Sequence, residues 1–179
     1  MLYATQRDWT HKQFISNETA DTLVNAYISS KHDSNNALLF KISKTLINKL
    51  QMIQNNAARL ISKKRKYDSV EQTRKQLHWL PVEYRIHYKI ILLTFKCMNN
   101  LAPAYLSDLL VLYTPARSLR SSDQNLLQER KSRTVFGDRA FAVCAPVLWN
   151  RLPLDLRALK NIDSFKTGLK THLFNIAFQ

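Results

Sequence analysis

One segment of this sequence has residue types that can do chemistry. It is a run of cationic side chains followed by a tyrosine. Residues 59–67 contain a run of basic residues ending in an aromatic ring: Arg59, Lys63, Lys64, Arg65, Lys66 and Tyr67. Lysine and arginine neutralise phosphates, and a tyrosine ring can stack on a base, so the segment is suited to binding nucleic acid. The same run fits a short basic nuclear-import signal. The alternative is a solvated turn whose charges only aid solubility.

A second, looser basic segment follows downstream. Its cations are Arg117, Arg120, Arg130, Lys131 and Arg133. Residues 114–136 are polar and lack a clear period, so we expect a long basic loop. Such a loop could become ordered on nucleic acid. An ordinary exposed loop is an equally open interpretation.

Other chemistry finds little support in the sequence. No two aspartates are adjacent, and the two glycines, Gly137 and Gly168, cannot build a phosphate-binding loop. The histidines and cysteines do not have zinc-ligand spacing. We therefore expect no catalysis, no metal and no cofactor. Trp79 and Trp149 sit beside apolar residues and a proline, which favours core packing over base stacking.

The charge of the chain is strongly positive and unevenly distributed. The net charge is +14, of which residues 1–58 contribute +2 (6 basic, 4 acidic) and residues 59–179 contribute +12 (21 basic, 9 acidic). This balance favours a polyanionic partner, either RNA or DNA or an anionic membrane. No apolar run is long enough for a membrane span or a secretion signal. Cys97 and Cys144 lie far apart, so we expect an intracellular protein, nuclear or cytoplasmic.

The elements that must position these residues are predicted to be helices. Glycine is scarce, 2 of 179 residues, against a usual fraction of about 7%. We expect an all-α fold, an irregular bundle of about six helices. At its centre we expect the helix at about residues 81–100, which is apolar round most of its circumference.

Apolar spacing and capping residues give more detailed expectations. Leu23, Ala26 and Tyr27 are predicted to form the buried face of a first helix that Asn17 caps. Asp68 and Glu71 have capping-box spacing. Pro146 is expected to interrupt a helix. Asp163 or Ser164 is expected to cap the last one, whose inward residues are Phe165, Leu169, Leu173 and Ile176.

Several long segments carry a family resemblance. The longest is LHWLPVEYRIHYKIILLTFKCMNNLAPAYLSDLL, residues 77–110. Before it come KLQMIQNNAARLI (49–61) and RKYD (65–68); after it come RSLRSSDQNLL (117–127), GDRAFAVCAPVLWNRLPLDLR (137–157) and SFKTGLKTHLF (164–174). In order and spacing they resemble the region downstream of the polymerase core in non-LTR retrotransposon reverse transcriptases of the jockey and chicken-repeat kind. The resemblance covers roughly residues 14–178. It departs after Asp33, where the family has a tyrosine and a cysteine and this chain has Ser34 and Asn35.

The resemblance implies an organisation. Residues 1–13 fall outside it, and we expect them to be poorly ordered. Residues 14–62 would correspond to the end of the thumb and the connection beyond it. Residues 63–179 would be the basic C-terminal region, and the two parts would form one compact unit. No strand-borne aspartate pair of the family polymerase is present.

Three functional hypotheses remain open. In the first, the chain is a non-catalytic fragment of an RNA-directed DNA polymerase of a transposable element. It grips RNA or DNA, which the resemblance favours over a membrane as the polyanionic partner. Alternatively, it is a structural or protein-interaction module that packs on the missing polymerase core. The third possibility is the inert product of a decayed element.

Overall fold

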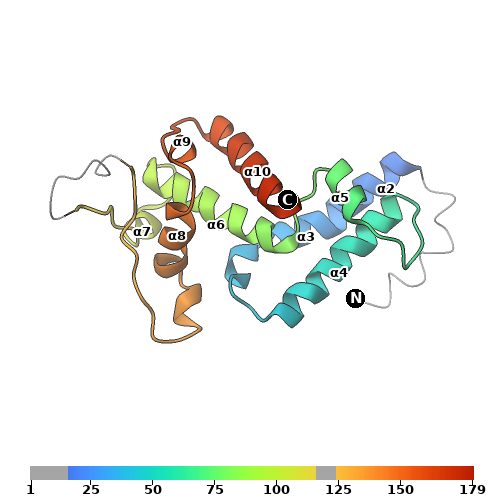
Figure 1. The fold of residues 1–179 in the computed structure, drawn as a ribbon, viewed down its shortest axis with the longest axis horizontal. Helices are drawn as coiled ribbons and strands as arrows, with labels where there is room; N and C mark the ends of the chain where they lie inside the picture. The colour runs from blue at the N-terminus through green and yellow to red at the C-terminus, as the bar shows by residue number, and fades with distance from the viewer. Residues whose placement is uncertain (1–15, 116–123) are drawn as a thin grey trace. The chain divides into compact units, whose positions relative to one another are not determined.

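The computed structural model describes residues 16–115 and 124–179, and within them the predicted all-α class is confirmed (Figure 1). The β pairing in the described residues is one isolated bridge between Leu112 and Leu127. The α-helices are α2 (Asn17–Val24), α3 (Ser30–Asp33), α4 (Lys44–Ile61), α5 (Glu71–Gln76), α6 (Val82–Met98), α7 (Ala104–Ser107), α8 (Phe141–Asn150), α9 (Leu154–Arg157) and α10 (Ile162–Phe178). The described residues also contain a π-helical turn, η3 (Asn25–Ser29), and two 3₁₀ turns, η4 (Asn36–Leu39) and η5 (Gly137–Arg139).

The chain divides into two compact units. The described part of the first unit is residues 16–35 and 42–82, and that of the second unit is residues 36–41, 83–115 and 124–179. This division reflects which parts of the chain contact one another. The division predicted at residue 62 reflects regions of the family that the sequence resembles, and it stays a prediction. Residues 1–13 lie outside the described residues.

The core of the first unit forms where α2 packs on α4. Buried residues of α2 and α4 meet there, with partly buried residues around them: Ala20, Val24, Ala57 and Ile61, then Ile28, Leu60, Leu77 and Trp79. The face predicted from Leu23, Ala26 and Tyr27 is wrong, because all three are exposed. The alanines explain the change, since small side chains let two helices approach closely.

Two glutamines of α4 bond the backbone at the start of α6. Gln54 is buried and its Nε2 donates to the Leu80 carbonyl at 2.8 Å. The Val82 N–H donates to Gln51 Oε1 at 3.0 Å. The second bond satisfies the Val82 N–H, one of the donors that a helix start leaves without an intrahelical partner.

Aromatic rings form the core of the second unit. Phe95 of α6 stacks on Phe165 of α10 with ring centroids 4.1 Å apart, and Trp149 of α8 lies 5.9 Å from Phe165. Ile86 and Ile90 of α6 are also buried, so the prediction of an apolar central helix is confirmed within this unit. Core packing is confirmed for Trp149, which is 1% exposed, and Trp79 is half-buried in the first unit. The free thiols of Cys97 and Cys144 are buried as well.

Several predicted helix ends are wrong by a few residues. Ser16, not Asn17, caps α2, because its hydroxyl accepts the Thr19 N–H at 3.1 Å. Asn161 caps α10 by accepting the N–H groups of Asp163 and Ser164. The expected interruption of a helix at Pro146 is also wrong, because α8 continues through this residue. The inward face of α10 is confirmed at three positions, but Ile176 is 46% exposed near the helix end.

Candidate nucleic-acid interface

The first basic turn, residues 62–70, begins where α4 ends. Ser62 is the C-cap of α4, and Lys63 follows it with a φ of 53°. The Lys64 N–H then donates to the Arg59 carbonyl at 3.1 Å. A left-handed residue with this return bond is the usual way in which a helix stops, although glycine is the common residue there. The helix end therefore places the Lys63 side chain on the surface, where it is exposed.

Asp68 closes the turn. Its carboxylate accepts the Arg65 N–H at 2.7 Å, and its own N–H donates to the Arg65 carbonyl at 3.2 Å. The predicted capping box is therefore wrong, because Val70 is the N-cap of α5 and makes no side-chain cap bond. Aspartate bonds nearby main-chain groups readily, so this local bond competes with the helix cap.

Two of the predicted phosphate-binding cations bond the backbone of the turn. Arg59 donates to the Asp68 carbonyl through Nε and Nη2, both at 3.3 Å, and to Asn56 Oδ1 at 3.1 Å. Lys64 Nζ donates to the Ser69 carbonyl at 3.0 Å. These side chains keep their charge near the surface while they fix the shape of the turn.

The remaining predicted residues of the first basic turn project into solvent. Lys63, Arg65 and Lys66 are exposed, and Tyr67 is 90% exposed. Lys66 Nζ lies 5.6 Å from the centroid of the Tyr67 ring. Exposed cations in the same turn as an accessible aromatic ring can contact phosphates while the ring contacts a base. The structure thus brings together the charge and the ring that the sequence placed side by side.

The second basic segment is described only in part. Arg117 and Arg120 lie outside the described residues, while Arg130, Lys131 and Arg133 are exposed. Where it is described, the predicted loop at 114–136 contains no helix. This segment belongs to the second unit, and the first basic turn belongs to the first unit.

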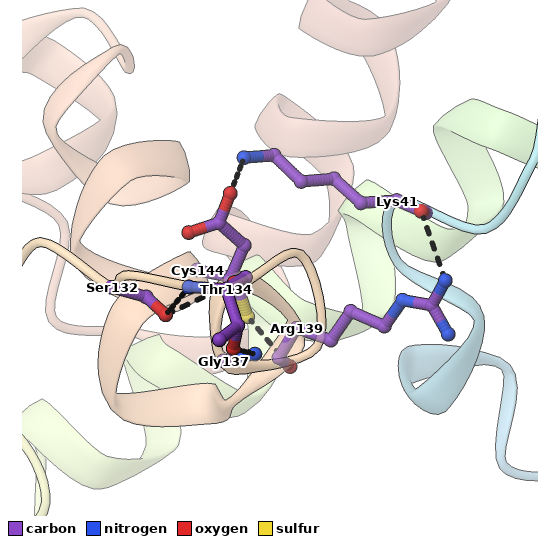
Figure 2. A network of polar contacts seen from close by, with 7 residues as sticks. Lys41, Ser132, Thr134, Gly137, Arg139 and Cys144 are labelled. Atoms are coloured by element: carbon purple, nitrogen blue, oxygen red, sulfur yellow. Dashed lines mark hydrogen bonds and ion pairs between the residues drawn. The ribbon is translucent and has the colours of Figure 1, made fainter.

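Residues 130–139 form a second basic turn that polar contacts fix (Figure 2). Ser132 Oγ accepts the Thr134 N–H at 3.1 Å, and the Gly137 N–H donates to Thr134 Oγ1 at 3.0 Å. Lys41 pairs with Asp138 at 2.9 Å, and Arg139 Nη2 donates to the Lys41 carbonyl at 3.4 Å. Asp138 does not cap the following helix, because Ala140 is the N-cap of α8 and makes no side-chain cap bond.

Two residues of the second basic turn were missed by the sequence analysis. Phe136 is 79% exposed, and the Arg139 guanidinium carbon lies 5.0 Å from the centroid of its ring. The available signal was an aromatic residue between arginines in RTVFGDR. It resembles the signal in RKYD at the first basic turn.

Metal and thiol chemistry can be checked against the described residues. Residues 16–115 and 124–179 contain no group of three or more His, Cys, Asp or Glu that could hold a metal ion. Burial raises the pKa of the Cys144 thiol to about 11, and burial also raises the pKa of Cys97. Both thiols are therefore protonated at neutral pH and are poor nucleophiles and ligands.

In the described ranges, none of the helices has both the length and the apolar character needed to cross a membrane. Among known proteins, no family model, no curated sequence and no solved structure matches this chain. The assignment of a function therefore depends on the geometry of the two basic turns and on the resemblance in motif order.

Proposed function

We propose that this chain binds RNA or DNA through the phosphate backbone and does no catalysis itself. The observation that carries the proposal is the first basic turn. Lys63, Arg65, Lys66 and Tyr67 are exposed together on a backbone that Asp68 holds from within the turn. Cations fixed on a formed turn neutralise phosphates at a lower entropy cost than the same cations on a free chain.

On the resemblance in motif order, we further propose where the chain belongs. It would be the C-terminal region of a non-LTR retrotransposon reverse transcriptase, an RNA-directed DNA polymerase. There it would help to grip template RNA or target DNA during target-primed reverse transcription. The net charge of +12 over residues 59–179 supports this role, because a polyanion is held by the summed field as well as by single contacts.

The test is a fluorescence-anisotropy titration of an oligonucleotide at several salt concentrations. For about five phosphate contacts, log affinity should fall against log salt with a slope of about −4. The variant is Lys63→Ala, Arg65→Ala, Lys66→Ala, which leaves Arg59 and Lys64 to hold the turn. It should weaken binding to every sequence and flatten the slope by about 2.

A matched control removes the same charge elsewhere in the first unit. Lys31, Lys44 and Lys49 are exposed on α3 and α4, so their replacement by alanine lowers the net charge equally. We expect this variant to keep most of the slope. If both triple variants lose equal affinity, general charge explains the binding, and the first basic turn is only a solvated turn.

A second candidate function has its own supporting observation. Side chains along residues 101–113 expose apolar surface: Leu101, Tyr105, Leu109, Val111, Leu112 and Tyr113. No lysine or arginine occurs in residues 97–116. An apolar surface without cations favours a protein partner, and the missing polymerase core is the partner that the resemblance implies. This candidate, and the inert product of a decayed element, predict no salt-dependent binding of nucleic acid in the same titration.

A further inference from the structure

We propose that Phe136, on the second basic turn, is a stacking platform for an unpaired base of single-stranded nucleic acid. The inference rests on the proposed function. It adds Phe136 as a contacting residue, base stacking as the kind of contact, and a single strand as the bound form of the nucleic acid. The second basic turn is residues 130–139, as described above. Its ligand would be a single strand, because only unpaired bases present a free face to an aromatic ring.

The exposure of apolar side chains on this turn calls for a partner. Phe136 is 79% exposed and its neighbour Val135 is 66% exposed. A large aromatic side chain normally contributes to a core, and adjacent exposed apolar side chains often mark a binding surface. The second unit already has a core in which Phe95 and Phe165 stack. Phe136 is therefore held outside that core by the path of its own turn.

The backbone of the turn is fixed around Phe136. The Thr134 carbonyl accepts the Asp138 N–H at 3.1 Å, and the Phe136 carbonyl accepts the Arg139 N–H at 3.1 Å. Side chains of Ser132 and Thr134 bond the same stretch, as Figure 2 shows. A ring presented by a formed turn loses less freedom on binding than a ring on a free chain.

Gly137 is required by the same packing. A Cβ at this position would clash with Ser132 Oγ and would lie 3.1 Å from Thr134 Oγ1. Even an alanine there must displace the hydroxyls that form the turn. A side chain at position 137 would therefore disturb the hydroxyl groups that fix the turn beside Phe136.

The charge around the ring matches a polyanion. Arg130, Lys131 and Arg133 are exposed, and the carboxylate of Asp138 is paired with Lys41. The Arg139 guanidinium lies 5.0 Å from the ring centroid, and a cation beside a ring adds to base stacking. A protein partner would use the apolar surface of Phe136 but has no need of these cations.

The test compares Phe136→Ala with Phe136→Tyr in anisotropy titrations against oligo-dT, oligo-U and a duplex of equal length. Phe136→Ala should lower affinity for both single strands by about 5- to 100-fold, the usual effect of removing one stacked ring. Phe136→Tyr should stay within about twofold of the wild type. Duplex affinity should change by less than about twofold in both variants. Equal effects on oligo-dT and oligo-U are expected, because stacking on the ring does not depend on the sugar of the strand.

The matched control is Tyr105→Ala. Tyr105 is an aromatic residue of the second unit, 69% exposed, in a stretch without lysine or arginine. It should leave affinity for single strands unchanged. Circular dichroism melting of all variants checks that the fold is kept, which we expect because both rings are exposed.

A second measurement locates the contact. A single strand carrying 5-iodouracil, irradiated with the wild-type protein, should cross-link to the peptide that contains Phe136. Unchanged single-strand affinity in Phe136→Ala, or an equal loss for the duplex, or no cross-link at Phe136, would each overturn the inference. If binding nevertheless stays sensitive to salt and to the triple substitution in the first basic turn, the proposed function stands without it. If the wild type binds no nucleic acid at any salt concentration, both are wrong.

Discussion

The carboxylate of Asp68 bonds the main chain of its own turn. It accepts the Arg65 N–H at 2.7 Å, so the acidic residue that follows the basic run helps to shape it. A charge-assisted bond of this kind is stronger than a neutral one. Arg59 and Lys64 add bonds to main-chain carbonyls of the turn. At the residue scale, a local cluster of charges thus divides into side chains that build the turn and side chains that it exposes.

His87 gives the stability of the protein a predictable pH dependence. Its ring lies 5.8 Å from that of Phe40 and 5.9 Å from that of Tyr84. Burial lowers the pKa of His87 and Arg151 lowers it further, while Glu83 raises it. Because the folded pKa lies below the unfolded value of about 6.5, the unfolded state takes up more protons as the pH falls. The free energy of unfolding should therefore decrease as the pH drops below about 6.5.

Urea unfolding at pH 7 and pH 5 measures this effect. His87→Phe keeps an aromatic ring between its neighbours and removes the titration, so its loss of stability between the two pH values should be smaller than that of the wild type. Part of the loss should remain, because burial lowers the pKa of His172 in the same direction. Identical losses in the variant and the wild type would show that His87 does not contribute.

The exposure of cations and of Tyr67 in residues 63–67 was predictable from the sequence, whereas contacts that form only in the folded chain were not. The exposed cations of residues 63–66 and Tyr67 follow from their spacing. The structural roles of Arg59 and Lys64 do not, because they depend on carbonyls of Asp68 and Ser69 that only the folded turn brings near. Phe136 was missed since its exposure depends on a turn that Lys41, about a hundred positions earlier in the sequence, helps to fix.

At the scale of elements, α6 contributes several buried residues to the core of the second unit. Ile90 is 1% exposed, and Phe95 in the next turn stacks on Phe165. We predict that Ile90→Asp unfolds or aggregates the protein, because it places an unpaired carboxylate in the core. The cost is several kcal/mol, a large part of a usual stability of about 5–15 kcal/mol.

Two companion variants test this reasoning about α6. Ile90→Val should cost only about 0.5–1.5 kcal/mol in thermal or urea unfolding. Lys89→Asp places the same carboxylate on the exposed neighbouring position and should leave the protein folded. An Ile90→Asp protein with an unchanged melting temperature would mean that α6 is not central.

Helices were easier to predict than their ends and faces. Scarce glycine and apolar periodicity indicated α6 and α10 correctly, since long helices repeat their signal over several turns. Caps depend on single residues: Ser16 stands one position before the predicted cap of α2, and Asn161 stands two or three positions before the predicted caps of α10. The buried face of α2 depends on Ala20 packing with α4, and an alanine carries little signal of its own in a sequence.

At the scale of the whole molecule, the distribution of acidic groups bears on catalysis. The nine aspartates and four glutamates include no adjacent pair of aspartates. Within residues 16–115 and 124–179, His, Cys, Asp and Glu do not gather in threes as metal ligands. Nucleotide transfer by a polymerase needs carboxylates that hold two metal ions about 3.5–4 Å apart. The proposed fragment would depend on the polymerase core of a full-length element for that chemistry.

We therefore predict that the purified chain shows no template-dependent DNA synthesis. The measurement is primer extension on an RNA template with magnesium and deoxynucleotides, beside a reverse transcriptase as a positive control. The same preparation should bind the primer-template, and the Lys63→Ala, Arg65→Ala, Lys66→Ala variant should bind it less tightly, since binding and synthesis use different groups. Synthesis above a no-protein control that survives further purification would contradict the proposal of a non-catalytic segment. Synthesis that disappears on purification would instead indicate a contaminating polymerase.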